Sequence, residues 1–237
     1  MIEIKNISKH FGKLEVLKQV NLHFSKGECV ALLGPNGSGK TTLVKSILGM
    51  VLPSSGEIFF DGKSIFKDWH YRENIGYMPQ IGRYPENLSI GQVFDLMQDI
   101  RRDFKGEKDR ELIQSLQLDT MMDKKMRTLS GGTRQKVSAA LAFLFNPEVL
   151  FLDEPTAGLD PESSLILKSK IIQAQQSGKL ILITSHVLSE LDQLVNRIVF
   201  IQDGNILFND SLEELHLFSG KTNLTEAIAH IMKNRHG

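Results

Sequence analysis

The chain has 237 residues, of which 41% are hydrophobic, so it is long enough for one large domain or two small lobes with a substantial core. Lysine plus arginine and aspartate plus glutamate number 28 each, which gives a formal net charge of zero at pH 7. This balance argues against a nucleic-acid binder that relies on neutralising phosphates, and against a polybasic membrane anchor.

The N-terminal residues lack the basic and apolar regions of a signal peptide, and no stretch approaches the roughly 20 apolar residues that span a bilayer. Cys29 is the only cysteine, so no disulfide can form within the chain and we expect a reducing cytoplasm. In its apolar run, Cys29 is expected to be a small buried hydrophobe and not a reactive thiol. We expect a soluble protein that reaches a membrane only through a partner.

Turn residues divide both ends of the chain into strand-like pieces. Gly12 separates residues 2–7 from residues 16–24, and Asp-Gly pairs, which favour tight hairpin turns, stand at 61–62 and 203–204. We expect antiparallel strands there. The predicted hairpins cover residues 57–65 and 198–208.

The middle of the chain alternates short apolar strands with helices, which is typical of a parallel sheet. The pattern becomes helical after residue 82, with apolar side chains at helical spacing over residues 90–100. Near the C-terminus, Asn223 and Glu226 form a capping-box pattern that opens an amphipathic helix. The predicted strands are residues 28–33, 149–152 and 180–184, and the predicted helices include residues 42–48, 134–145 and 161–176.

Residues 34–41, Gly-Pro-Asn-Gly-Ser-Gly-Lys-Thr, match the phosphate-binding loop pattern G-x-x-x-x-G-K-[ST] at every constrained position. Glycines let the backbone turn tightly and bring successive N–H groups close to phosphate oxygens. Lys40 adds a charge for the β- and γ-phosphates, and the Thr41 hydroxyl can ligate Mg²⁺. A predicted strand precedes the loop and a predicted helix follows it, which completes an anion site. The chain is therefore expected to bind a nucleoside triphosphate.

A second motif is the apolar strand that ends in Asp153 and Glu154. In NTPases with this type of loop, the first acid after such a strand completes the Mg²⁺ shell, directly or through water. A second acid one residue on can polarise the attacking water. Two helix caps are a common alternative for an isolated Asp-Glu pair, but the phosphate loop in the same chain favours the metal and catalytic roles.

Ser130, Gly131 and Gly132 precede a strongly helical segment and form a second anion-binding turn. One nucleotide offers a single γ-phosphate, whereas this chain carries two phosphate-binding elements. The economical explanation is that each nucleotide site is shared between two copies of the chain.

The order of these motifs resembles that of the nucleotide-binding subunits of ABC (ATP-binding cassette) transporters, and the resemblance covers residues 1 to about 215. It implies an α/β fold of the ABC ATPase type: a P-loop NTPase core with a mostly parallel sheet and flanking helices, plus an antiparallel β subdomain and an α-helical subdomain. The expected division is a core of residues 1–81 and 147–215, a helical subdomain of residues 82–146 and a C-terminal helical extension of residues 216–237.

The resemblance also implies the cofactors ATP and Mg²⁺, a dimer of two copies that sandwiches two nucleotides, and a transmembrane permease subunit. Through that permease the chain would be peripheral on the inner face of the cell membrane. No nucleic-acid partner is expected.

The resemblance assigns roles to residues whose own sequence signal is weak. Phe11 matches the aromatic residue that stacks on adenine, Gln80 the Q-loop amide near Mg²⁺ and the attacking water, and His186 the histidine at the γ-phosphate. Asp160, in the D-loop, would couple the two sites. The implied nucleotide-binding residues are Phe11, Gly34, Pro35, Asn36, Gly37, Ser38, Gly39, Lys40, Thr41, Thr42, Ser130, Gly131, Gly132 and Asp160; the metal-binding residues are Thr41, Gln80 and Asp153; and the catalytic residues are Glu154, His186 and Gln80.

Two positions depart from the family pattern: Thr133 stands where glutamine is usual, and Phe11 where tyrosine is common. The serine and glycines that donate to phosphate remain, and stacking needs only a π-face, so we expect activity to survive. A regulatory cassette without hydrolysis is disfavoured because Asp153, Glu154 and His186 are all present.

The main alternative is a soluble ABC protein that acts in translation or DNA repair. Translation-type members usually carry two cassettes, and repair-type members a long coiled-coil insertion. This chain has one cassette and only 48 residues between Gln80 and Leu129, with zero net charge, which favours a transporter subunit.

Residues 129–143 resemble one subgroup of the family, the ATPase that serves nitrous-oxide reductase maturation and is linked to copper-site or sulfur supply. A generic exporter-type cassette is an equal alternative. A membrane subunit absent from this chain would hold the cargo, so the cargo stays open.

Overall fold

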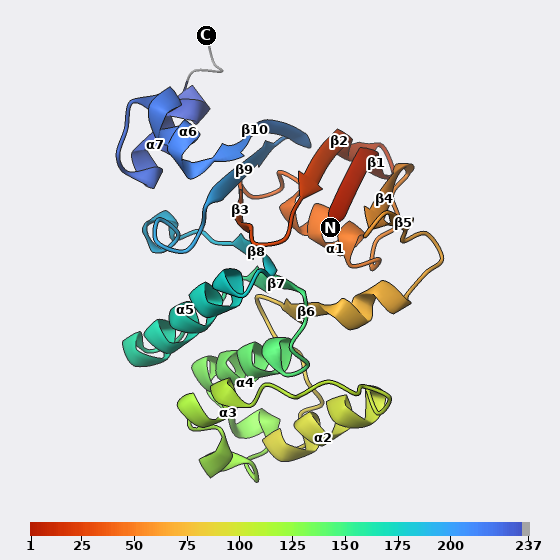
Figure 1. The fold of residues 1–237 in the computed structure, drawn as a ribbon, viewed down its shortest axis with the longest axis vertical. Coiled ribbons are helices and arrows are strands. Elements are labelled where there is room, and N and C mark those ends of the chain that lie inside the picture. Colours follow the sequence, from red (N-terminus) through yellow and green to blue (C-terminus); the bar gives the residue numbers. More distant parts are fainter. Residues whose placement is uncertain (234–237) are drawn as a thin grey trace.

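The computed structural model describes residues 1–233, which form two β-sheets above a lobe of helices (Figure 1). The strands are β1 (Ile2–Phe11), β2 (Leu14–Phe24), β3 (Cys29–Leu33), β4 (Ser55–Phe60), β5 (Lys63–Ser64), β6 (Ile75–Met78), β7 (Val149–Asp153), β8 (Leu180–Thr184), β9 (Arg197–Gln202) and β10 (Asn205–Ser211). The helices are α1 (Lys40–Ile47), α2 (Ile90–Ile100), α3 (Glu111–Ser115), α4 (Gly131–Phe143), α5 (Pro161–Gln176), α6 (Leu212–Ser219) and α7 (Leu224–Lys233). Single 3₁₀ turns cover His70–Asn74, Asp119–Met121, Met126–Thr128 and Leu188–Glu190.

The larger sheet has the strand order β10-β9-β3-β8-β7-β6, and of these described strands only β10 runs antiparallel to its neighbour. Alternate side chains of β3 enter two different cores: Cys29, Ala31 and Leu33 pack on one face, and Val30 and Leu32 on the other. Burial on both faces explains why these strands are continuous apolar runs. The carboxyl ends of β3, β8 and β7 share one edge, where open α/β sheets bind their ligands.

The second sheet, in the order β2-β1-β4-β5, is antiparallel throughout. Its β4–β5 hairpin turns at Asp61 and Gly62, both at positive φ, as the Asp-Gly pair predicts. Apolar side chains of this sheet share a core with α1 and one face of the larger sheet. The antiparallel sheet therefore fixes α1, and with it the phosphate loop.

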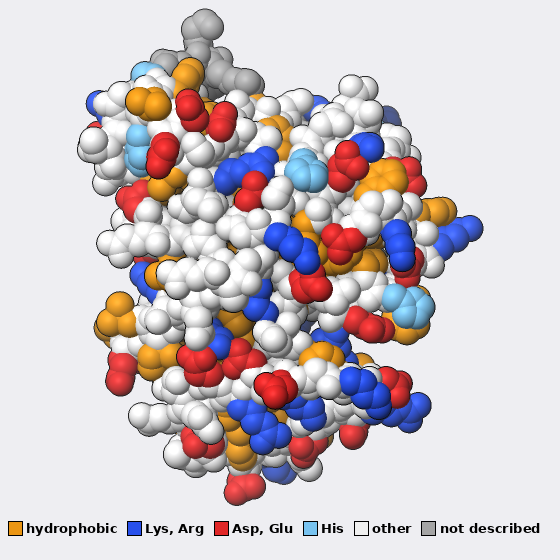
Figure 2. Space-filling model, viewed as in Figure 1, with side chains coloured by type: hydrophobic (Ala, Val, Ile, Leu, Met, Phe, Trp, Pro, Cys, Tyr) orange, Lys and Arg blue, Asp and Glu red, His pale blue; other side chains and the backbone are white. Residues whose placement is uncertain are grey.

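The lobe of α2, α3 and α4 lies at the bottom of Figure 1 and carries intermixed charges of both signs on its visible surface (Figure 2). Ser89 caps α2 in a capping box with Gln92. Helix α4 packs directly on β6. The approach is so close that a Cβ at Gly76 would lie 2.1 Å from the carbonyl oxygen of Ala142. The glycine thus allows the lobe to sit against the edge of the larger sheet.

Two helices beside β10 form the C-terminal part of the described chain (Figure 1). Helix α6 was not predicted, although the Ser211 hydroxyl accepts a hydrogen bond from the Glu214 N–H at 3.1 Å and so caps it. The boundary predicted between residues 215 and 216 falls inside α6. Asn223 caps the next helix, as predicted, through the Thr225 N–H. Residues 234–237 of the predicted extension lie outside the described residues.

The predicted alternation of strands and helices is confirmed, and α2, α5 and β8 have the predicted bounds. Strand β4 starts earlier than predicted, because Ser55 pairs with Ser8 in β1. Cys29 is fully buried, and burial raises the pKa of its thiol to about 12, which confirms an unreactive role. Within residues 1–233, the helices are all too short or too polar to span a bilayer.

Candidate active site

Two glycines in the loop between β3 and α1 have no room for a side chain. Gly34 has a φ of 149°, and a Cβ there would lie 1.9 Å from the carbonyl oxygen of Ile201 in β9. Gly39 has a φ of 110°, and its Cβ would lie 2.8 Å from the carbonyl oxygen of Val16 in β2. Both sheets therefore hold the loop against them only because these residues are glycines.

The N-terminus of α1 is open to an anion. The helix begins at Lys40 without a side-chain cap and without an acidic residue in its first turn, so its first N–H groups lack intrahelical partners. The Ser38 hydroxyl is buried, at 2% exposure, and has no hydrogen-bond partner among the described residues. A phosphate group would satisfy these donors, so the loop fits a nucleoside triphosphate.

Lys40 stands between the loop and the acidic residues. Its Nζ donates to the carbonyl oxygens of Gly34 at 2.7 Å and Pro35 at 2.9 Å. Burial lowers the pKa of its ammonium group, and the carboxylates of Asp153 and Glu154 act in the opposite direction. The charge of Lys40 is therefore held where it can meet phosphate oxygens.

Asp153 ends β7 at the carboxyl edge of the sheet, and its Oδ1 accepts a hydrogen bond from the Thr184 hydroxyl at the end of β8. This bond orients the carboxylate. The Thr41 hydroxyl and the Gln80 amide line the same cavity, and hard oxygen donors of this kind fit Mg²⁺. Residues 1–233 hold no cluster of three or more His, Cys, Asp and Glu side chains that could hold a metal ion.

Glu154 is buried, at 8% exposure, and its φ of 52° lies in the left-handed region. Burial raises the pKa of its carboxyl group, while His186 reduces the shift through a hydrogen bond and its charge. The Nε2 of His186 lies 3.4 Å from Oε1 of Glu154. A carboxylate with a raised pKa accepts a proton more readily near neutral pH, so Glu154 suits a general base.

These side chains line one cavity of about 380 Å³. Leu14, Val16 and Thr184 also line it, and sequence patterns did not mark them. Gly34 and Pro35 are not among its lining residues and instead hold Lys40 through their carbonyl oxygens. The predicted site residues that line the cavity are Phe11, Asn36, Gly37, Ser38, Gly39, Lys40, Thr41, Thr42, Gln80, Asp153, Glu154 and His186.

The second predicted anion-binding turn, Ser130 to Gly132, belongs to the family's signature motif and is called the signature turn below. It does not line this cavity in the described chain. Ser130 caps α4, since its Oγ accepts a hydrogen bond from the Thr133 N–H at 3.2 Å. Gly131 is exposed, and a Cβ there would have no atom within 4 Å. Gly132 packs closely on the D-loop, where its Cβ would lie 2.6 Å from the Gly158 carbonyl oxygen. The open side of the turn faces solvent.

Asp160 also lies outside the cavity, and its contacts join two helices. Its Oδ1 accepts a hydrogen bond from the Ser163 N–H at 2.8 Å, which caps α5, and its Oδ2 lies 2.9 Å from Nζ of Lys136 on α4. These two contacts lower the pKa of the Asp160 carboxyl group. The sequence did not mark Lys136, because nothing local indicates its partner 24 residues away.

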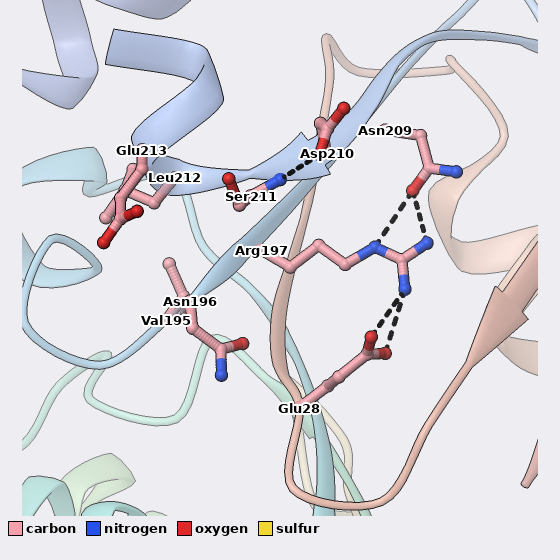
Figure 3. Close-up of a pocket in the computed structure, with 9 residues that line it drawn as sticks. All are labelled: Glu28, Val195, Asn196, Arg197, Asn209, Asp210, Ser211, Leu212 and Glu213. Carbon is pink, nitrogen blue, oxygen red and sulfur yellow. Dashed lines mark hydrogen bonds and ion pairs between the residues drawn. The ribbon is translucent and has the colours of Figure 1, made fainter. Parts of the chain in front are cut away.

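A second cavity, of about 660 Å³, opens where β3 and β9 begin (Figure 3). Nη1 of Arg197 donates to both carboxylate oxygens of Glu28 at 2.9 Å, and Nη2 donates to Oδ1 of Asn209 at 2.7 Å. These contacts tie β9 to β10 and to the start of β3. Since Arg197 is paired with Glu28 and the cavity lies away from the carboxyl ends of the parallel strands, we assign it a structural role.

The phosphate loop at the carboxyl edge of a mainly parallel sheet, with Asp153 and Glu154 beside it, defines a P-loop nucleoside triphosphatase. Residues 17–157 match the ABC transporter family, and the chain belongs to that family. It is an ATPase that uses ATP and Mg²⁺, and the predicted ABC ATPase fold is confirmed.

Two similar proteins are both named as ATP-binding proteins. The chain is 35% identical over 216 residues to the ABC transporter ATP-binding protein YtrB of Bacillus subtilis, covering 91% of this chain and 73% of that one. It is 32% identical over 207 residues to the Nod factor export ATP-binding protein I of Burkholderia lata, covering 86% and 68%.

Solved structures of ABC transporter cassettes have the same fold as this chain. An ATP-binding subunit of an ABC transporter matches with a TM-score of 0.89 at 26% identity, covering 98% of this chain and 99% of that one. A dimeric bacterial ABC transporter cassette matches with a TM-score of 0.77 at 25% identity, covering 90% and 99%.

Proposed function

We propose that this chain powers an ABC transporter, and that two copies close head to tail over two ATP molecules. The observation that carries the proposal is the separation of its two phosphate-binding elements. The loop at residues 34–41 opens into the cavity of Glu154, whereas Ser130 and Gly131 are exposed and do not line that cavity. A signature turn from a second copy would complete each site. The similarity to a dimeric cassette supports this arrangement.

Within each site, the loop N–H groups and Lys40 would bind the phosphates, and Phe11 would stack on the adenine. Glu154 would accept a proton from the water that attacks the γ-phosphate in line, with His186 holding the geometry. Ser130 and the glycines of the other copy would donate to the γ-phosphate, and Asp160 would couple the two sites. ADP and phosphate are the products.

The metal role is proposed for Thr41, Asp153 and Gln80, whose oxygen atoms line the cavity. When bound there, Mg²⁺ neutralises charge on the phosphate oxygens. Thr184 contributes by holding the Asp153 carboxylate in one orientation.

Hydrolysis removes the γ-phosphate that joins the two copies, so the dimer would reopen. We propose that the helical subdomain, residues 82–146, moves as a body against a membrane subunit during this cycle. The core of residues 1–81 and 147–215 would hold the nucleotide.

A membrane partner is supported by exposed apolar side chains around a cavity of about 870 Å³ beside β4 and β5. Leu52, Phe66 and Trp69 line this cavity and are 64%, 63% and 59% exposed. Figure 2 shows hydrophobic side chains among charged ones of both signs on this edge of the molecule. Exposed apolar groups that gather in this way mark interaction sites. We propose a transmembrane permease subunit as the occupant, which would keep the chain at the inner face of the cell membrane.

For the cargo, we keep two proposals of equal standing. Residues 129–143 resemble the ATPase of nitrous-oxide reductase maturation, which would link transport to copper-site or sulfur supply. The alternative is a generic exporter-type cassette, which the similarity to a Nod factor export protein supports. Purifying the chain with its membrane partner and assaying each cargo class in vesicles distinguishes them.

Substitution of Glu154 by glutamine tests the proposed mechanism. The amide keeps the size of the side chain but cannot accept the proton, so Glu154→Gln should lower kcat by about a hundredfold or more. ATP binding should persist, and a dimer should accumulate with ATP on size-exclusion chromatography. Undiminished hydrolysis by the variant would overturn the assignment of Glu154 as the base.

A charge at Trp69 tests the partner surface. Trp69→Glu should reduce the fraction of the chain that sediments with membranes of its source cells, while the basal ATPase rate stays unchanged. Leu165→Glu is the matched control, since Leu165 is 68% exposed on α5 outside this cavity. Equal membrane association of both variants and the unmodified chain would reject this surface.

A further inference from the structure

We propose that Gln135 is a positioning residue for Glu154, and that it joins the signature helix of one chain to the catalytic base of the same chain. The inference rests on the proposed function in one respect, namely that Glu154 is the base. Gln135 lies on the second turn of α4, in the helical lobe, whereas Glu154 follows β7 in the core. The contact between them therefore crosses from one part of the molecule to the other.

The side chain of Gln135 is 5% exposed. Its Nε2 donates a hydrogen bond to the carbonyl oxygen of Glu154 at 3.0 Å and lies 3.5 Å from the carbonyl oxygen of Pro155. On the other side, the Glu154 N–H donates to the carbonyl oxygen of Thr184 at 3.0 Å. The Glu154 carbonyl oxygen also accepts a hydrogen bond from the Ala157 N–H at 3.1 Å. The peptide group before the Glu154 Cα is thus held by β8, and the one after it by α4 together with the local turn to Ala157.

This double anchoring matters because the backbone of Glu154 is strained. Its φ of 52° lies in a region that residues with a Cβ rarely adopt, and such a conformation persists only where the surroundings hold it. The direction of the Glu154 carboxylate depends on this backbone conformation. Loss of the bond from α4 would leave the Glu154 carbonyl oxygen held only by the Ala157 N–H of its own turn, so the peptide could relax and turn the carboxylate away from the reacting water.

Neighbouring contacts show that α4 holds the whole segment from Glu154 to Asp160. Gly132 packs against the Gly158 carbonyl oxygen, and Lys136 lies 2.9 Å from Asp160. Ser130 caps the same helix. A displacement of the signature turn on contact with a second copy therefore reaches the peptide of Glu154 through one rigid helix.

Gln135 does not line the nucleotide cavity. A residue that only positions the base should change kcat and leave ATP binding and KM unaltered. This split separates positioning from a purely structural role, since a general loosening of the fold would weaken nucleotide binding as well.

The test uses Gln135→Met, which keeps an unbranched side chain of similar length but lacks the donor. We expect kcat to fall between about tenfold and a hundredfold, with KM and the ATP dissociation constant within about twofold of the unmodified chain. Gln135→His should retain more of kcat than Gln135→Met, because an imidazole N–H can replace the amide donor. Ser138→Ala is the matched control: Ser138 is also buried on α4, at 1% exposure, and should keep kcat.

An unchanged kcat in Gln135→Met would overturn the inference, as would a loss explained by weaker ATP binding. If Gln135→Met does not fold, the test is the comparison of Gln135→His with Ser138→Ala. Equal, normal rates together with normal ATP binding in Gln135→His support the donor role. A rise in KM alone contradicts it. A wrong assignment of Glu154 as the base is distinguished from a wrong assignment of Gln135 by the Glu154→Gln variant. If Glu154 is not the base, that variant still hydrolyses ATP.

Discussion

At the scale of single residues, the proposed general base, Glu154, is a carboxylate kept in an unfavourable environment. Burial raises the pKa of Glu154 in the folded chain above its value in the unfolded chain. A carboxyl group with this shift destabilises the fold where it is ionised in both states, which is above the folded pKa. The destabilisation disappears below the unfolded pKa, where the group is protonated in both states.

This sign gives a prediction for stability. Without nucleotide, Glu154→Gln should raise the melting temperature near pH 8, by a few degrees at most, because the buried charge is gone. The difference should vanish as the pH falls below about 4, where the unfolded carboxyl is protonated. Thermal scans of both proteins from pH 4 to pH 8 measure it. A variant that melts below the unmodified chain at pH 8 would show that Glu154 is stabilised, not strained.

Local sequence predicted the residues whose role follows from a motif. Gly37, Gly39, Lys40 and the Asp153–Glu154 pair line the cavity that the motifs indicate. Gln135 and Thr184 could not be predicted in this way. Their function lies in contacts with residues that are distant in the sequence, and neither residue type has a propensity that indicates such a contact.

At the scale of elements, an ion pair joins α5 to the segment that leads into α3. Nζ of Lys170 lies 2.7 Å from Asp109 and 2.6 Å from Glu111, and the Lys170 side chain is 8% exposed. These carboxylates raise the pKa of Lys170 against the opposing effect of burial. The ion pair fixes one side of the helical lobe to the core.

Removing the lysine should cost stability. Lys170→Met should lower the free energy of unfolding by about 1–3 kcal/mol, less than for a fully buried pair because Glu111 is half exposed. Urea unfolding at pH 7 measures the loss. Lys26→Met is the control, since the Lys26–Glu148 pair is exposed and should contribute little. Equal stability of Lys170→Met and the unmodified chain would contradict a stabilising ion pair.

The positions of helices and strands could be predicted from the sequence where turn or capping residues mark their ends. Asp-Gly turns set both hairpins, and Pro161 after Asp160 set the start of α5. Strand β4 was harder, because Ser55 and Gly56 look like a break and become a strand only by pairing with β1. The start of α6 does carry a local signal, Ser211 followed three residues later by Glu214, which is a capping pattern.

At the scale of the whole molecule, the proposed function makes each chain the carrier of two incomplete halves of a site. The loop and the base lie in one cavity of the core, while the exposed signature turn belongs to the helical lobe. Sequence alone indicated this arrangement by counting phosphate-binding elements. The sequence did not reveal that α4 connects the exposed signature turn to Glu154 of the same chain. This connection depends on how the helical lobe packs on the core.

The claim that sites are shared is tested most directly by mixing two inactive chains. Lys40→Ala removes the phosphate-binding charge of the loop. Gly131→Asp leaves the chain free to fold, since a Cβ at Gly131 has no atom within 4 Å, but its carboxylate would repel a phosphate brought by a partner. Each chain alone should be inactive.

Mixed dimers would contain one site with an intact loop and an intact signature turn. Random pairing into symmetric dimers then restores about a quarter of the wild-type number of intact sites, so ATPase activity should appear on mixing. The rate of phosphate release, measured against the ratio of the two chains, should be greatest for equal amounts. Two inactive chains that stay inactive when mixed, at concentrations where the unmodified chain hydrolyses ATP, would contradict the shared site.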